Sequence, residues 1–170
     1  NQKLISLKDL NFNREIKETE NTIKKNAFIK ADFIFNKYGV NCFSDDSGLQ
    51  VDALDNQPGV RSARYAGENA SSNDNVDLLL ENLKYIKDRR AKFITSICLI
   101  INSDVIFFEG MIRGNITHTR RGDNGFGYDP IFVPDGYKKT FAEMPFEYKN
   151  SISHRAIAIK KLVKYLNSLN

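Results

Sequence analysis

The stretch Ser44-Asp45-Asp46-Ser47-Gly48-Leu49 decides the interpretation of the fold, because it places two adjacent carboxylates between two apolar segments. An apolar run over residues 40–43 precedes it and an alternating run over residues 49–54 follows it, which predicts a polar corner between two strands. Neighbouring side chains of an extended chain point to opposite faces, so Asp45 and Asp46 do not form one pair unless the turn twists them together. One of the two is therefore expected to have a distant partner. The alternative is a turn in which these side chains bind their own backbone.

The composition is that of a soluble globular protein. The chain has 170 residues, 41% of them hydrophobic and 27% charged, which suits one domain with a sizeable core and argues against long disorder. No apolar run approaches the roughly 20 residues of a membrane span, and no basic and apolar leader opens the sequence, so we expect a cytoplasmic protein that does not enter a membrane. The net charge of +4 permits a phosphate-bearing ligand without requiring nucleic acid. Cys42 and Cys98 lie in apolar runs and are expected to be reduced core residues.

Hydrophobic periodicity predicts three helices and several strands. The helices are expected from residue 21 or 22 to 38, over residues 73–87, and from residue 151 or 153 to about 166. Beside the two strands at the polar corner, further strands are expected at residues 4–7, 91–102, 105–113, 115–119 and 131–133, with a tight hairpin between the second and third of these segments. This order predicts an α/β fold with a mixed central sheet flanked by helices.

Lys30 lies at the edge of the apolar arc of the first predicted helix. A lysine in that position commonly extends past the core into water. The same position, pointing toward the edge of a sheet, also makes Lys30 a candidate ligand for an anion.

The glycine-rich segment 120–127 ends in Phe126-Gly127-Tyr128-Asp129-Pro130. Pro130 disfavours the helical region for Asp129 and so predicts that this carboxylate is held extended at the start of a strand. Gly125 and Gly127 give the Phe126 ring little local cover. Phe126 is therefore either a core residue of a mobile loop or a stacking platform for a flat ring.

A cluster of positive groups surrounds the start of the last predicted helix. His154 and Arg155 fall in its first turn, and Lys149 comes just before it. The helix dipole disfavours cations at this end. The cluster is either a chance surface arrangement or a site for an anion or a carbonyl-rich ligand.

These segments together resemble the inosine triphosphate pyrophosphatase family, which hydrolyses deaminated purine nucleoside triphosphates. The resemblance covers nearly the whole chain in five motifs, which are Glu18-Thr19 with Asn26-Ala27-Phe28-Ile29-Lys30-Ala31, the Ser44–Leu49 stretch, Pro58-Gly59-Val60-Arg61-Ser62-Ala63-Arg64-Tyr65-Ala66-Gly67, Gly125-Phe126-Gly127-Tyr128-Asp129-Pro130, and Lys149 with Ser151, Ser153, His154 and Arg155. Five motifs in the same order are far more specific than any one of them.

The resemblance implies an elongated ITPase-like fold, a homodimer, and conversion of ITP, dITP or XTP to the monophosphate and pyrophosphate. It implies that Glu18 and Asp46 hold Mg²⁺ and that Asp46 is also the general base. Lys30 and Ser47 correspond to triphosphate ligands of the family. The positions that correspond to its base pocket are Phe126, Gly127, Tyr128, Asp129, Lys149, His154 and Arg155.

Family members open with a strand and a phosphate loop, and no such segment precedes Leu4 in this sequence. We expect one ITPase-like domain over residues 1–170 whose first strand and phosphate loop are either absent or lie upstream of residue 1. Without that loop, binding of a monophosphate should survive and hydrolysis should be much weaker, because each lost donor is typically worth several kcal/mol.

Two other functions compete with this interpretation. A Maf-type house-cleaning nucleotide pyrophosphatase would act on other modified nucleotides. A nucleic-acid-binding module would use the basic balance of the chain and stack bases on Phe126 and Tyr128. The second leaves the two carboxylates unexplained, because they repel a phosphate backbone unless a metal intervenes.

Overall fold

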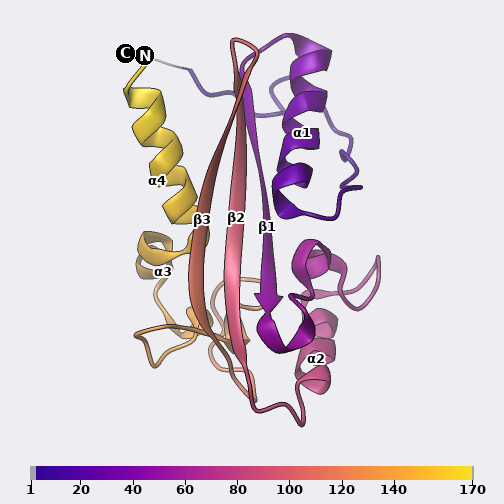
Figure 1. The fold of residues 1–170 in the computed structure, drawn as a ribbon, viewed down its shortest axis with the longest axis vertical. Coiled ribbons are helices and arrows are strands. Elements are labelled where there is room, and N and C mark those ends of the chain that lie inside the picture. Colours follow the sequence, from indigo (N-terminus) through magenta and orange to yellow (C-terminus); the bar gives the residue numbers. More distant parts are fainter. Residues whose placement is uncertain (1–2, 170) are drawn as a thin grey trace.

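The computed structural model describes residues 3–169, and three long strands form its centre. The strands are β1 (Cys42–Val51), β2 (Arg90–Ile101) and β3 (Asp104–Ile116), and the short β4 (Phe132–Pro134) pairs with the end of β3. Their order in the sheet is β1-β2-β3-β4, and every neighbouring pair is antiparallel. The sheet is a long twisted ribbon with helices on both sides (Figure 1), which confirms the α/β class with flanking helices. The predicted mixed sheet is wrong for residues 3–169, because all of their strand pairings are antiparallel.

In the described part of the chain, four α-helices accompany the sheet: α1 (Ile23–Tyr38), α2 (Ser72–Asn82), α3 (Phe146–Ile152) and α4 (His154–Asn167). Short 3₁₀ helices occur at η1 (Asp52–Leu54), η2 (Gly59–Arg64), η3 (Asp129–Ile131) and η4 (Phe141–Glu143). Within residues 3–169, no helix has the length and apolar character needed to cross a bilayer.

Helix α1 begins and ends where its sequence predicts. The Thr22 side chain accepts a hydrogen bond from the Lys25 backbone, and Gly39 ends the helix in the left-handed conformation at φ +64°. The predicted apolar arc is buried, with Phe35 partly covered. These limits place Lys30 in the middle of the helix, on a rigid support.

The two faces of the sheet carry different helices. Alternate β2 residues Cys98 and Ile100 pack against Ala27 and Ala31 of α1. Their neighbours Ile97 and Leu99 pack with β3 and α4 in a separate cluster. Because side chains alternate along a strand, α1 and α4 cover opposite faces. A third and larger cluster joins the far half of the sheet to α2 and to the segment between η3 and η4.

The predicted corner at residues 44–49 is wrong. This stretch lies inside β1, where Asp45 pairs with Ile97 and Asp46 with Ser96 in one unbroken antiparallel register. Asp and Ser residues favour turns because they can bind their own backbone, and that tendency is overridden here by ten consecutive pairings with β2. The strand ends at Val51, and residues 52–54 form η1.

Several element limits also differ from the predictions. Residues 4–7 form no strand. The predicted strand 115–119 is not a separate element, because residues 115 and 116 end β3 and residues 117–119 lie outside any strand. Helix α2 ends at Asn82 and not at residue 87, because the chain turns after Leu83, whose carbonyl accepts a hydrogen bond from Arg89. Lys149, predicted to come just before the last helix, belongs to α3, a separate short helix.

Candidate active site

A cavity of about 370 Å³ lies where most of the elements meet. Its lining includes Lys30 from α1, residues 45–49 from β1, Phe93 from β2, the segment 126–129, Lys149 from α3, and His154 and Arg155 from α4. Nearly all of the site residues predicted from the sequence therefore line one space, although they come from every part of the chain. Glu18 is not in that lining, but it contacts Lys30, which is.

Strand β1 separates the two adjacent carboxylates, as its extended geometry requires. Asp46 lies near Glu18 and Lys30, on the side of α1. Asp45 binds Arg155 of α4, a residue 110 positions away. The expectation that one of the two has a distant partner is confirmed for Asp45. Since the side chains diverge, the strand places one carboxylate in each half of the cavity.

Glu18, Lys30 and Asp46 form the acidic half of the site. The Lys30 ammonium lies 2.6 Å from Glu18 Oε1 and 3.8 Å from Asp46 Oδ1. Lys30 is therefore a partner of the two carboxylates and does not extend freely into water, because only about a fifth of its side chain is exposed. The ammonium offsets part of the repulsion between the two carboxylates.

Burial and the nearby Glu18 carboxylate raise the pKa of Asp46 to about 6, and the Lys30 ammonium opposes this shift. Oδ2 of Asp46 is buried and has no hydrogen-bond partner among the described residues. A buried carboxylate oxygen without a hydrogen-bond partner destabilises the fold unless a ligand binds it. Two convergent carboxylates with one free oxygen fit Mg²⁺, which binds through one or two carboxylates together with substrate phosphates.

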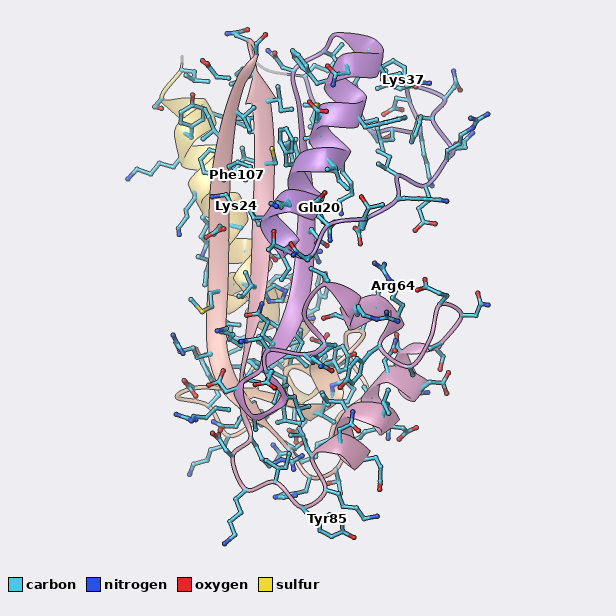
Figure 2. The ribbon with its side chains drawn as sticks, turned by 45° about the vertical axis from the view of Figure 1, so that its right-hand side comes forward. Glu20, Lys24, Lys37, Arg64, Tyr85 and Phe107 are labelled. Carbon is cyan, nitrogen blue, oxygen red and sulfur yellow. The ribbon has the colours of Figure 1, made fainter. Side chains whose placement is uncertain are left out.

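Two further residues of this half had no role assigned from the sequence. Arg64 of η2 lies 3.7 Å from Glu18 Oε2 through Nη1, and its Nη2 donates to the Glu18 carbonyl at 3.4 Å. Figure 2 shows Arg64 on η2, beside the segment that leads into α1. Asn26 is fully buried, accepts a hydrogen bond from the Glu20 backbone, and lies near enough to Asp46 for its amide to lower the pKa of that carboxyl, although Asn26 Nδ2 makes no hydrogen bond with the described residues. The sequence carried one signal for Asn26. It lies about one helical turn before Lys30, and that spacing puts both side chains on the same face of the helix.

Asp129 and Lys149 organise the other half of the site. The Lys149 ammonium binds Asp129 Oδ2 in a buried ion pair, and the same oxygen accepts a hydrogen bond from the Phe126 backbone at 2.8 Å. The ammonium also lies 4.7 Å from the centroid of the Phe126 ring. Gly125 is required beside this pair, because its φ is +81° and a Cβ there would come within 2.1 Å of Asp129 Oδ2. Asp129 thus fixes the turn that carries Phe126, and it begins the 3₁₀ helix η3, so its predicted extended position at the start of a strand is wrong.

The two aromatic residues of this segment have different environments. Phe126 is 69% exposed and lines the cavity, so its ring is not a core residue and is available for stacking. Tyr128 is 4% exposed, belongs to the large core cluster, and donates to the Ser62 carbonyl. Gly127, at φ +59°, makes the turn between them. Because Tyr128 is buried, it cannot stack an exposed base of a nucleic acid.

His154 lies under the cavity with its ring stacked on Phe93, at 4.7 Å between centroids and 10° between planes. Burial lowers its pKa to about 3, with the Arg155 and Lys149 charges acting in the same direction. The imidazole is therefore neutral at ordinary pH, and its buried Nδ1 has no partner within residues 3–169. A neutral ring at this position offers one donor and one acceptor to a ligand.

The shift at His154 predicts a change in the acid stability of the fold. The folded pKa of about 3 lies below the ordinary value of 6.5, so the stability from this group is complete above 6.5 and is lost as the pH falls toward 3. His154→Gln removes that proton uptake and should flatten the fall in melting temperature between about pH 7 and about pH 4. His118→Gln, at the other and exposed histidine, should follow the wild-type slope. Equal slopes for all three proteins would contradict a buried neutral His154.

The start of α4 is held against the sheet at Gly110 of β3. A Cβ at Gly110 would lie 2.0 Å from the His154 carbonyl oxygen and 2.6 Å from the Ala158 nitrogen. Only a residue without a side chain allows this approach. Ser153 caps the helix by accepting from the Ala156 backbone, so the positions of His154 and Arg155 are fixed from two sides.

Arg155 is anchored on β1. Its Nε and Nη2 donate to Asp45 Oδ2 at 3.1 and 2.9 Å, and Nη2 lies 3.4 Å from Ser47 Oγ. Ser47 Oγ is also 2.7 Å from the hydroxyl of Thr95. The Ser47 hydroxyl therefore lies with Arg155 and not with Lys30, while its backbone nitrogen donates to Asp46.

A sequence model of the Ham1 family matches residues 1–165. A dITP/XTP pyrophosphatase of Flavobacterium johnsoniae is 48% identical over 165 residues, which are 97% of this chain and 86% of the relative. Another from Porphyromonas gingivalis is 48% identical over 164 residues, covering 96% of this chain and 84% of the relative.

Solved structures agree with these sequence relatives. The Ham1 protein of Staphylococcus aureus superposes with a TM-score of 0.93 at 38% identity, over 98% of this chain and 87% of that protein. The nucleoside-triphosphatase / dITP/XTP pyrophosphatase of Mycobacterium abscessus gives a TM-score of 0.82 at 41% identity, over 96% of this chain and 85% of that protein. Sequence and fold agree over almost the whole chain, which belongs to the Ham1 family.

Proposed function

We propose that this protein hydrolyses deaminated purine nucleoside triphosphates, such as dITP, XTP and ITP, to the monophosphate and pyrophosphate. The observation that carries the proposal is one cavity with two chemically different halves. Lys30 and Asp46 in the lining, with Glu18 in contact with Lys30, suit a metal and phosphates, while Phe126, His154 and Arg155 suit a flat ring that carries oxygen acceptors. The relatives named dITP/XTP pyrophosphatase support the same substrate class.

In this reaction water attacks the α-phosphorus and pyrophosphate leaves. Asp46 accepts the proton of the attacking water, and its raised pKa of about 6 suits a base that works near neutral pH. The Lys30 ammonium offsets negative charge on the phosphates. Mg²⁺ held by Glu18 and Asp46 would supply further positive charge when bound. Arg64 orients Glu18 through its contacts with the carboxylate and the carbonyl.

Selectivity at the base follows from the direction of hydrogen bonds. Hypoxanthine and xanthine carry an oxygen acceptor at C6, whereas adenine carries an amino donor. Arg155 only donates, so adenine at this place would set donors against donors, at about 1–3 kcal/mol for each buried group left unpaired. Phe126 would cover the ring, and the neutral His154 would add a hydrogen bond at its edge.

Three features of the proposal come from the family resemblance. They are the identity of the metal as Mg²⁺, a homodimer, and a cytoplasmic location, where the nucleotide pool is. Activity against added Mg²⁺ after treatment with a chelator tests the first, and light scattering of the purified protein tests the second.

The reaction itself is tested by identifying the products of ITP by phosphorus NMR. The proposal predicts IMP and pyrophosphate in equal amounts. IDP and inorganic phosphate would show attack at the γ-phosphorus and would refute it. Turnover of modified pyrimidine triphosphates without turnover of ITP would favour the Maf-type alternative.

Phe126→Ala should weaken nucleotide binding by roughly 1–3 kcal/mol, the typical loss for one base stacked on an aromatic ring. The melting temperature should hardly change, because the ring is 69% exposed. Binding of IMP by calorimetry measures the first quantity. Phe146→Ala, at another exposed phenylalanine, is the control and should bind IMP normally. A large fall in melting temperature with unchanged affinity would show that Phe126 is structural.

A further inference from the structure

We propose that Asp45 determines specificity by holding the Arg155 guanidinium in position as a donor to the base. This inference rests on the proposed function and adds to it a residue that does not touch the metal half. Asp45 would be a positioning residue, since it acts on the nucleotide only through Arg155.

The hydrogen bonds define the orientation of the guanidinium. Nε and Nη2 of Arg155 both donate to Asp45 Oδ2, at 3.1 and 2.9 Å. A planar guanidinium held through two of its nitrogens cannot rotate about its last bond without breaking one of these contacts. Within residues 3–169, the third nitrogen, Nη1, makes no hydrogen bond. The pair therefore fixes the plane and leaves one nitrogen for a ligand.

The support under Asp45 is rigid. Asp45 lies within β1 and pairs with Ile97 of β2, and the next residue on the same face, Ser47, is tied to Thr95 of β2. Nη2 of Arg155 is 3.4 Å from the Ser47 hydroxyl. Groups placed on paired strands are held more closely than groups on loops. The position of Arg155 is thus set by the sheet as well as by its own helix.

The Arg155–Asp45 ion pair is too exposed to solvent for its main role to be stabilisation of the fold. The side chains of Arg155 and Asp45 are 43% and 39% exposed, and ion pairs of that kind contribute little to folding. A second effect of the pairing is on charge. Asp45 neutralises Arg155, just as Asp129 neutralises Lys149 in the same half of the cavity. The half of the cavity proposed to bind the base attracts a triphosphate less when its cations are already paired. This pairing disfavours a nucleotide bound with its triphosphate in that half.

The experiment is a double-mutant cycle in the complete protein, with kcat/KM measured for ITP and ATP. Asp45→Ala should lower kcat/KM for ITP about 10- to 100-fold, the range expected for losing one hydrogen bond from a charged donor, and should not lower that for ATP by more than about threefold, because adenine offers no oxygen acceptor at C6. Arg155→Ala should do the same. The double variant should be no worse than Arg155→Ala, because Asp45 acts only through that residue.

Asp45→Asn keeps the shape and one acceptor oxygen, so it should recover part of the ITP activity, and it replaces Asp45→Ala if the alanine variant folds poorly. Asp104→Ala, at an exposed acid at the start of β3, is the control and should behave as wild type. Equal losses on ITP and ATP, or losses that multiply in the double variant, would overturn the role of Asp45. A wild-type protein without preference for ITP would overturn the proposed function as well, whereas a preference that Asp45→Ala leaves intact overturns this inference alone.

Discussion

Asp46→Asn is expected to lower kcat by about 10²- to 10⁴-fold, the usual contribution of a positioned general base, and by more if the carboxylate also holds the metal. The fold should remain intact. Asp46 is a buried carboxylate beside the Glu18 carboxylate, with Oδ2 unpartnered among the described residues, so neutralising it removes repulsion and an unsatisfied charge. The melting temperature at neutral pH should be unchanged or higher. Loss of turnover without loss of stability is the result expected for a residue that is retained for catalysis.

The matched control is Asp52→Asn. Asp52 lies six residues further along the chain in η1, is exposed, and has no role in the proposed reaction. Its variant should keep wild-type turnover and stability. Turnover of Asp46→Asn within a few fold of wild type would remove Asp46 from the mechanism, whatever the result for Asp52.

Lys30→Met should lower kcat about 10²- to 10³-fold, comparable to the removal of one preorganised donor to the transition state. Methionine keeps the length of the apolar stem while removing the ammonium that lies 2.6 Å from Glu18 and 3.8 Å from Asp46. Only Arg64, 3.7 Å from Glu18, would then offset the repulsion between the two carboxylates, so the melting temperature should also fall. Added Mg²⁺ should raise the melting temperature of this variant more than that of wild type, since binding to the folded state stabilises it.

The control for this variant lies on the same helix. Lys24 of α1 is exposed and its ammonium is 4.5 Å from the centroid of the Phe107 ring of β3 (Figure 2). Lys24→Met removes the same charge from the same helix outside the cavity, and it should leave kcat unchanged. If both variants lost activity equally, the effect would belong to the overall charge of the protein and not to the site.

The parts of the fold that sequence predicts are those with local causes. Helix α1 is specified by the Thr22 cap, the Gly39 terminator and a regular apolar arc, and the β2–β3 hairpin by two apolar runs with a tight link. The corner predicted for the polar stretch 44–49 is wrong, because that prediction could use only the local preference of Asp and Ser residues for turns. Its pairing with β2 and the cavity that receives its side chains are tertiary features.

The sequence predicted the residues that line the candidate site more completely than it predicted the contacts among them. Asp46 and Lys30 could be chosen from sequence because the motifs carry them, but the contact of Lys30 with both carboxylates depends on how α1 packs on β1. The pairing of Asp45 with Arg155 spans 110 positions and has no local cause. Arg64 lies in a motif that sequence singled out, yet only the packing of η2 brings it to Glu18.

The cavity is expected to accept a deaminated purine and to reject adenine. The most direct test is kcat/KM for ITP, dITP, XTP, ATP and GTP under one set of conditions with pyrophosphate detection. All five substrates carry the same triphosphate, so any phosphate contact made outside residues 3–169 affects them alike. The kcat/KM values for ITP, dITP and XTP are expected to exceed that for ATP by about 10²-fold or more, which corresponds to one or two unpaired buried groups in the complex with adenine. Equal values for ITP and ATP, or a preference for ATP, would contradict it.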